Sequence, residues 1–287
     1  MISYSEKINY LTSSISKKLR HWKNQCPYCK SDLRYGHVVD AKYVVTSLVE
    51  CSTCNMLVRT PTDNPAESDS FYQEAYSQEY TTDCPAPEEL SKLMDRNFEG
   101  TDRDYTRYIN FFRFLGVPDG ARVLDFGCSW GYGLYQFRKA GYQAEGFEVS
   151  LPRARYGKER MKLPVSFSVK DVKGKFDVIF SSHVLEHLPD FSTINNLYEN
   201  NLVTNGLFIA VTPNGSEAYR LADHNAYHQI WGKVHPVLLS DKFVKKNFGK
   251  ELVYIDSWNT MTPEFKRAPF SPVLDKYELV YVLKARV

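Results

Sequence analysis

The sequence predicts an α/β protein built on one open sheet, preceded by a small metal-binding module. Residues 121–150 are patterned as strand, glycine-rich turn, helix, turn and strand, which is one right-handed βαβ unit. Further apolar runs at 176–180 and 207–211 have the composition of buried strands in such a sheet. Two C-x-x-C pairs lie upstream of these runs and indicate a separate metal-binding segment.

Length and composition limit the classes of protein to consider. The chain has 287 residues, of which 43% are hydrophobic, enough for a sizeable core in one large domain or two. A formal charge of +2 gives no strong indication of nucleic-acid binding. The N-terminus lacks the apolar region of a signal peptide, and no stretch approaches the ~20 apolar residues of a membrane span. We therefore expect a cytoplasmic protein of undefined oligomeric state.

The glycine-rich turn predicts a ligand site. Gly127 and Gly131 can adopt positive φ and carry no Cβ, so a ligand can lie against the backbone. Asp125 ends the first strand, where an acid repels a pyrophosphate but suits a cationic or zwitterionic ligand. The spacing from Asp125 to Gly131 also differs from the GxGxxG of dinucleotide sites. Glu148 lies about twenty residues further on, where an acid accepts both hydroxyls of a ribose.

The four cysteines near the N-terminus predict a structural zinc site. Cys26 and Cys29 form the first C-x-x-C pair, and Cys51 and Cys54 form the second. Together the pairs offer tetrahedral ligation by four sulfurs, which leaves no open position for substrate. Residues 38–49 are patterned as a hairpin too small for its own core, so zinc would supply much of the folding energy. Reduced thiols without metal and a redox pair are the alternatives.

Several of these strings resemble class I S-adenosylmethionine (SAM)-dependent methyltransferases. Residues 121–150 resemble that family's motif I, hh(D/E)hGxGxG, and its acidic second motif, with Ser129 in place of the middle glycine. The string FDVI…LEHLPD in residues 176–190 closely resembles motif IV. The resemblance covers roughly residues 116–287. It implies a Rossmann-like sheet of seven strands, the last two at 252–257 and 277–283. The pattern of residues 165–169 predicts a short third strand of that sheet.

This resemblance divides the chain into four parts. They are an N-terminal helix or arm at 1–20, a zinc ribbon at 21–62, a linker with a helical cap at 63–115, and a methyltransferase domain at 116–287. Tyr72, Tyr76 and Tyr80 in the linker either pack or border the ligand. The ribbon-plus-methyltransferase layout resembles bacterial methyltransferases of sugar and cell-surface glycan pathways.

The resemblance also assigns residues to the cofactor. Asp171 and Val172 suit an adenine, because the carboxylate accepts from the exocyclic amine while the aliphatic group packs on the ring; a solvated turn acid is the alternative. Ser182 ends a strand, so it points toward the pocket at the carboxyl edge of the sheet. The predicted SAM-binding residues are Asp125, Gly127, Cys128, Ser129, Gly131, Glu148, Asp171, Val172 and Ser182.

Methyl transfer to a hydroxyl needs alignment and a base. The sulfonium methyl is already activated, so the enzyme aligns the acceptor and removes its proton, for which histidine is the natural base. His183 is placed by the strand end, His187 lies just beyond it on a predicted helix at 184–189, and His235 follows from the family resemblance. A packing role is the alternative for His187. Nothing argues for a catalytic metal, although Asp223, His224 and His228 could in principle hold one.

The insertion at about 215–236 bears on the acceptor. Its aromatic side chains and histidines are typical of a lid that stacks on sugars, and an aromatic-rich helix that packs on the core is the alternative. The leading hypothesis is O-methylation of a sugar or surface-polysaccharide precursor. The alternatives are a protein or RNA methyltransferase that docks through the ribbon, C- or N-methylation of a nucleotide sugar, and a non-catalytic SAM-binding protein.

Overall fold

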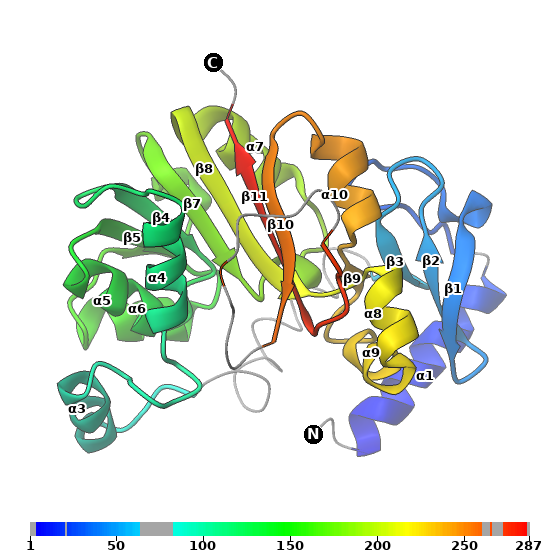
Figure 1. Ribbon diagram of the computed structural model, residues 1–287. Helices are drawn as coiled ribbons and strands as arrows, with labels where there is room; N and C mark the ends of the chain where they lie inside the picture. Colours follow the sequence, from blue (N-terminus) through cyan, green and yellow to red (C-terminus); the bar gives the residue numbers. More distant parts are fainter. Residues whose placement is uncertain (1–3, 21, 64–82, 260–264, 266–271, 286–287) are drawn as a thin grey trace.

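The computed structural model contains two β-sheets joined by helices (Figure 1). It describes residues 4–20, 22–63, 83–259, 265 and 272–285. Tyr72, Tyr76 and Tyr80 lie outside the described residues. The described helices are α1 Tyr4–Leu19, α3 Pro87–Asp95, α4 Thr106–Phe114, α5 Tyr132–Lys139, α6 Leu151–Glu159, α7 Ser192–Asn201, α8 Glu217–Ala222, α9 His224–Ile230 and α10 Asp241–Phe248.

The large sheet has the seven strands that the sequence predicts. In spatial order they are β10 Leu252–Trp258, β11 Glu278–Lys284, β8 Leu202–Pro213, β7 Phe176–Ser182, β4 Arg122–Phe126, β5 Gln143–Phe147 and β6 Val165–Ser166. Strands β6, β5, β4, β7 and β8 pair in parallel, whereas β11 pairs antiparallel with both β8 and β10. The strand order reverses between β4 and β7, and ligands bind at the carboxyl ends of strands at such a point.

The two faces of this sheet bury two apolar cores. Val178 and Phe180 of β7 face a core that includes residues of α4 and α5, while Ile179 between them faces a core shared with α7 and α10. This alternation is the period of two that an extended strand imposes. The sheet is therefore covered by helices on both faces, which leaves its edges and strand ends for ligands.

The small sheet contains the cysteine segment and is completed from far along the chain. Its strands are β1 His37–Lys42, β2 Thr46–Glu50, β3 Leu57–Thr60 and β9 Val237–Leu238. The first three form an antiparallel ribbon, and β9 pairs antiparallel with β3 through Val58 and Val237. The core beneath the ribbon is continuous with the core under α7 and α10. Figure 1 shows the ribbon beside α8, α9 and α10.

Two local predictions are wrong. The predicted helix at 184–189 is a single 3₁₀ turn, Leu185–His187, labelled η4, and α7 begins only at Ser192. Pro189 is the physical reason, because the residue before a proline avoids the helical region and Leu188 is extended. The predicted strand at 165–169 ends at Ser166, and a 3₁₀ turn follows at Val169–Asp171 because the Ser168 side chain accepts from the Lys170 amide.

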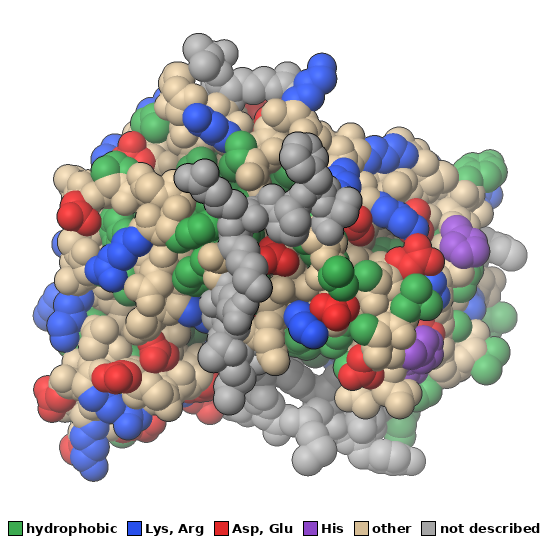
Figure 2. All heavy atoms as spheres, in the orientation of Figure 1, with side chains coloured by type: hydrophobic (Ala, Val, Ile, Leu, Met, Phe, Trp, Pro, Cys, Tyr) green, Lys and Arg blue, Asp and Glu red, His purple; other side chains and the backbone are tan. Residues whose placement is uncertain are grey.

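The small net charge and the lack of long apolar stretches in the sequence have counterparts in the structure. Figure 2 shows Lys and Arg side chains interspersed with Asp and Glu side chains over one face, without a large field of one sign. Among the described residues, no helix combines the length and the apolar character that a membrane crossing requires.

Candidate active site

The loop after β4 has the backbone that the glycine pattern predicts. Gly127, Ser129 and Gly131 all have positive φ, at 84°, 52° and 93°. A Cβ on Gly127 would lie 2.3 Å from Cγ2 of Val184, so both conformation and space require glycine there. The amides of Gly127 and Cys128 both donate to the carbonyl of Phe147, at 2.8 and 3.0 Å, and fix the loop against β5.

Two buried acids flank this loop. The carboxylate of Glu148 accepts from the amides of Ser129 and Ser150, at 2.9 and 2.7 Å. Asp125 is 1% exposed, and its Oδ2 has no hydrogen-bond partner among the described residues. Burial and the nearby charge of Glu148 raise the pKa of Asp125 to about 8. An unpaired acceptor beside a second acid fits a cationic ligand such as SAM.

The remaining predicted cofactor residues differ in their surroundings. Cys128 is buried, and a Cβ on Gly146 would lie 2.5 Å from its Sγ, so it packs against β5. The Oγ of Ser129 is buried without a hydrogen-bond partner among the described residues, as expected of a group next to a ligand. Asp171 is exposed and Val172 is buried in the core. Their assignment to adenine stays a prediction.

His183 lies at the end of β7 between two glutamates. Its Nε2 is 2.8 Å from Oε1 of Glu278, and its Nδ1 is 3.5 Å from Oε1 of Glu186. Burial alone lowers the pKa of His183, but the two neighbouring carboxylates outweigh it and raise the pKa to about 9. The ring is therefore an imidazolium at neutral pH in the ligand-free protein.

Three further residues lie at this position that the sequence did not predict: Arg107, Tyr108 and Glu278. Arg107 on α4 makes a bidentate ion pair with Glu278 at the start of β11, at 2.7 and 2.8 Å. Beside it, the hydroxyls of Tyr108 and Ser182 share a hydrogen bond of 2.8 Å. The predicted Ser182 thus belongs to a polar network at the carboxyl edge. The predicted helical cap at 63–115 includes α4, but no pattern in the sequence links α4 to β11.

His187 and His235 lie side by side, with ring centroids 4.8 Å apart. The Nδ1 of His187 is 2.7 Å from the carbonyl of Val234, and the Nδ1 of His235 is 2.6 Å from the carbonyl of Ile230. Burial lowers the pKa of His187 to about 4, so this ring is neutral at pH 7. The fully buried Glu186 accepts from the hydroxyl of Thr212 at 3.1 Å. The structure therefore brings all three predicted histidines around one carboxylate.

The aromatic insertion packs against the ribbon, which is the alternative that the sequence left open. Tyr227 and Trp231 are 1% and 2% exposed and share a core with Leu48 and Leu57 of the ribbon. Asp40 of β1 binds Nε1 of Trp231 at 2.8 Å. In this conformation the two rings face the ribbon, so they do not offer a stacking surface for a sugar.

The metal site considered for the insertion does not form. Asp223 accepts from the amide of Ala226 and caps α9, His224 is exposed, and the Nδ1 of His228 bonds Asp40 at 2.7 Å. In the described parts of the chain, two groups of possible metal ligands come together, and neither includes these residues.

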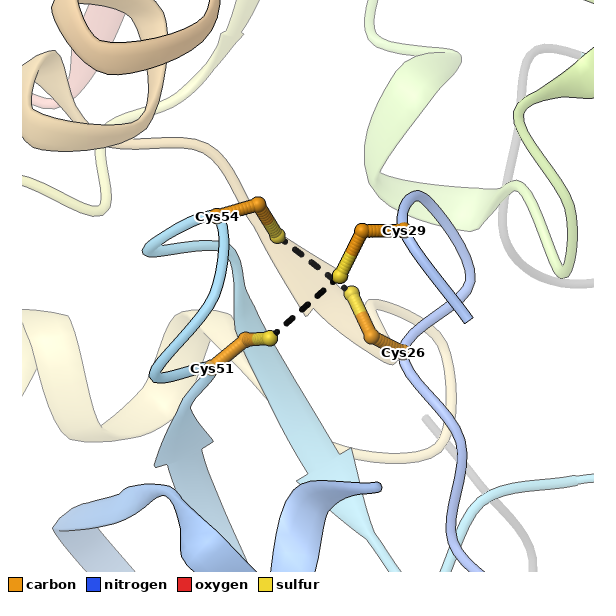
Figure 3. Close-up of side chains that lie close together, drawn as sticks. All are labelled: Cys26, Cys29, Cys51 and Cys54. Atoms are coloured by element: carbon orange, nitrogen blue, oxygen red, sulfur yellow. Dashed lines mark hydrogen bonds between the residues drawn. The ribbon is translucent and has the colours of Figure 1, made fainter. Parts of the chain in front are cut away.

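The first of those groups is the four predicted cysteines (Figure 3). Their sulfurs lie within 4.8 Å of one another, with Cys26 3.5 Å from Cys54 and Cys29 3.6 Å from Cys51. All four are free thiols. The Cys54 thiol lowers the pKa of Cys26 to about 6.

The two cysteine turns also share one backbone geometry. Lys30 and Asn55, which follow the second cysteine of each pair, have φ of 62° and 63°. Their amides donate to the carbonyls of Cys26 and Cys51, at 2.9 and 2.8 Å. Two matched turns that present four thiols to one point fit a tetrahedral ion.

The ribbon also contacts the segment that carries the predicted His235. The Arg59 amide in β3 donates to the carbonyl of Pro236 at 2.7 Å, and Val58 pairs with Val237. Because Pro236 follows His235 directly, the ribbon fixes the segment that carries this histidine.

Comparison with known proteins identifies the family of the chain. The model of a family described as a methyltransferase domain matches residues 96–242, more than half of the chain, and the chain belongs to that family. It is a SAM-dependent methyltransferase with the seven-stranded sheet of that class.

Individual relatives are distant. The ubiquinone biosynthesis O-methyltransferase of Rhodopseudomonas palustris (strain HaA2) is 22% identical over 174 residues, which cover 58% of this chain and 68% of that protein. The cyclopropane-fatty-acyl-phospholipid synthase of Escherichia coli (strain K12) is 30% identical over 106 residues, which cover 34% of this chain but 28% of that protein. The crystal structure of geranyl diphosphate C-methyltransferase from Streptomyces coelicolor A3(2) has a TM-score of 0.52 at 12% identity, covers 78% of this chain and 99% of that one, and shows the fold alone.

Proposed function

We propose that this methyltransferase transfers the methyl group to a hydroxyl of a small polyhydroxylated acceptor, with a sugar or surface-polysaccharide precursor as the substrate class. One observation carries the proposal: the histidine cluster begins directly at the cofactor loop. Val184, the residue between His183 and η4, lies so close to Gly127 that a Cβ there would clash with it. Groups able to activate a hydroxyl are therefore held beside the loop that we assign to SAM.

The site contains groups suited to a hydroxyl acceptor. A backbone carbonyl can only accept, so the Nδ1 atoms of His187 and His235 carry protons, and Nε2 is the atom of each ring that would take the acceptor's proton. The neutral ring of His187 can act as a base, a role worth ~10²–10⁴-fold. His183, Ser182 and Tyr108 add polar groups that can orient further hydroxyls of the acceptor. The relative named for ubiquinone biosynthesis is an O-methyltransferase, which supports oxygen as the acceptor atom.

The chain's own residues would divide the work as follows. When bound, SAM would supply a methyl group activated by its sulfonium, with S-adenosylhomocysteine as the leaving group. Glu148 would hold the ribose, and the acid Asp125 would balance the cationic ligand. The histidine cluster would orient the acceptor and remove its hydroxyl proton, which passes to solvent. We assign the four cysteines to a structural Zn²⁺ in a ribbon at 21–62 that keeps His235 in place.

The structure gives less support to docking of a macromolecule by the ribbon. Its β3 edge is paired with β9, and Leu48 and Leu57 are covered by the aromatic insertion. These contacts within the chain cover the β3 edge and the apolar side chains of the ribbon without an external partner.

The test is transfer of label from methyl-labelled SAM in an extract of the protein's own cells, followed by fractionation. We expect O-methyl ether label in the nucleotide-sugar, lipid-linked or polymeric glycan fraction. His187→Gln should reduce that label while retaining S-adenosylhomocysteine binding. Label in protein or RNA, or a C-methyl or N-methyl product, would overturn the proposal.

A further inference from the structure

A second group of possible metal ligands lies inside the histidine cluster. Glu186, His187 and His235 each present one ligand atom, and these atoms lie within 4.8 Å of one another. They come from two segments: η4 carries Glu186 and His187, and the loop between α9 and β9 carries His235. Nothing in the local sequence around either segment brings them together, so the fold itself makes this cluster.

The two imidazoles are oriented as metal ligands are. Each donates its Nδ1 proton to a backbone carbonyl, His187 to Val234 in the loop and His235 to Ile230 at the end of α9, so Nε2 is the nitrogen through which each ring would bind an ion. Histidines that bind metals almost always donate their other ring N–H to a carbonyl, carboxylate or water, because this bond fixes the tautomer and the ring. Here the supporting bonds are already in place on both rings.

The carboxylate between them lacks a full set of partners. Glu186 is 0% exposed, and its Oε2 accepts from Thr212. Its Oε1 has no hydrogen bond among the described residues, and lies 3.8 Å from Nε2 of His187. His183 approaches the same oxygen only to 3.5 Å, with its other nitrogen held by Glu278. A buried carboxylate oxygen that faces two imidazoles is a favourable position for a cation.

We propose that Glu186, His187 and His235 form a binding site for one divalent first-row transition-metal ion, distinct from the four-cysteine site. Two imidazoles and one carboxylate suit Zn²⁺, Mn²⁺, Fe²⁺ or Co²⁺, whereas Mg²⁺ and Ca²⁺ prefer oxygen ligands alone. Three protein ligands leave coordination positions open, as catalytic metal sites do and the cysteine site does not.

The proposed site deepens the proposed function and rests on it for the role of the open position. An acceptor hydroxyl bound there would lose its proton more readily, because a divalent ion lowers the pKa of a bound oxygen acid. His187 and His235 would then act through the ion, and the proton would pass to solvent. The binding itself can be measured without any acceptor.

The experiment counts metal in the full-length protein. Wild type is loaded with Zn²⁺, freed of excess by gel filtration and analysed by mass spectrometry. We expect two zinc ions per chain in wild type and one in Glu186→Gln. Changes to outer partners alone weaken metal sites 10–100-fold, so loss of a ligand should weaken this one by at least about 100-fold. His224→Ala, which removes an exposed histidine outside the cluster, should keep two.

A second measurement identifies the ligands. The spectrum of cobalt-loaded wild type minus that of Glu186→Gln should show ligand-field bands without sulfur-to-cobalt charge transfer. His235→Ala repeats the test from the other segment, and unchanged S-adenosylhomocysteine binding shows that each variant is folded. One zinc ion in wild type, two in both variants, or thiolate bands in the difference spectrum would overturn the site. Two ions in wild type with no glycan labelling would instead reject only the proposed function.

Discussion

The proposed cofactor half and the proposed acceptor half of the site are built in different ways. The cofactor half lies within residues 121–150, where the glycine loop, β5 and Glu148 are joined by backbone hydrogen bonds. The acceptor half draws on five separate segments: α4, the end of β7, η4, the loop before β9 and the start of β11. One half is therefore a local structure, whereas the other exists only when the whole fold is assembled.

This difference makes the ribbon a structural part of the acceptor half. His235 precedes Pro236, whose carbonyl is held by the Arg59 amide in β3, while the cofactor loop makes its own contacts to β5. A change that disrupts the ribbon should therefore impair the acceptor half and leave the cofactor half intact. Changes in the loop should affect cofactor binding and leave the metal sites intact.

The largest effect is expected from Cys51→Ser, which removes one of the four thiol ligands. Loss of zinc should release β9 and displace His235, and misplacement of a catalytic group by about 1 Å can cost 10²-fold in rate. We expect methyl transfer to fall by more than about 100-fold, while the affinity for S-adenosylhomocysteine changes by less than about threefold. Turnover and calorimetry measure the two effects.

Cys84→Ser is the matched control, because Cys84 is an exposed thiol outside the cluster. It should retain zinc, turnover and cofactor affinity. If Cys51→Ser loses cofactor affinity as severely as turnover, the two halves are not separable, and the comparison fails.

Gly127→Ala is the corresponding change in the cofactor half. The new Cβ would meet Val184 at 2.3 Å and would sit on a backbone with φ of 84°. Overpacking and positive φ each cost about 1–3 kcal/mol. We expect S-adenosylhomocysteine affinity to fall at least about tenfold, since about 1.4 kcal/mol is a factor of ten. Zinc content should be unchanged.

Gly141→Ala measures the cost of a positive φ without a steric clash. Gly141 has φ of 99° but no atom within 4 Å of an added Cβ. The variant should lose stability without losing cofactor affinity. Equal losses of affinity in the two variants would show that the contact with Val184 is unimportant.

The contrast between the halves also explains what the sequence could predict. Asp125, Gly127 and Glu148 lie on one short βαβ unit, so their spacing in the sequence predicts their positions in space. The spacing of the two cysteine pairs predicts in the same way that the four thiols meet at one point. The ion pair of Arg107 and Glu278 spans 171 positions, and it depends on where β11 enters the sheet. No periodicity carries that information.

For a related reason, the sequence of the aromatic insertion did not predict what its rings pack against. Trp231 and Tyr227 are apolar rings that would pack equally well on a sugar face or on Leu48 of the ribbon. Amphipathic pattern identifies a face that must be covered, but not what covers it. The helix predicted at 184–189 does not form, because Pro189 cannot continue a helix that the apolar spacing alone would favour.

A smaller effect is expected from the charge of Asp125. Its pKa is about 8 in the folded protein but about 3.9 in an unfolded chain. Between those values the folded protein keeps a proton that the unfolded chain has released, so this group lowers the stability of the ligand-free protein as pH rises from about 4 to about 8. Asp125→Asn should flatten that decline, which denaturant melts across pH would show.

The same titration couples to the cofactor. A cationic ligand favours the ionised carboxylate, so binding of SAM at pH 7 should release up to about one proton from wild type. Asp125→Asn should release less. Calorimetry in two buffers of different ionisation enthalpy measures the number, and equal release by both proteins would contradict the assignment of Asp125 to the cofactor.

The smallest effect is expected where the ribbon meets the large domain through charge alone. Lys30, next to Cys29, pairs with Asp190, but their side chains are 53% and 44% exposed. Exposed ion pairs of this kind contribute about 0–1 kcal/mol, because water screens them and two long side chains lose freedom. Lys30→Ala should therefore lower the free energy of unfolding by less than about 1 kcal/mol and leave turnover unchanged.

Tyr28, in the same cysteine turn, provides the contrast. Its ring packs edge-on against Phe191, Phe243 and Phe248, with centroids 6.1, 5.0 and 6.1 Å away. Removing such a ring leaves a cavity, so Tyr28→Ala should cost about 2 kcal/mol or more and reduce turnover before it reduces cofactor affinity. Urea melts and turnover of the two variants compare them. If Lys30→Ala is the more damaging change, the ribbon is held by charge, and the acceptor half should then weaken with salt while the cofactor half does not.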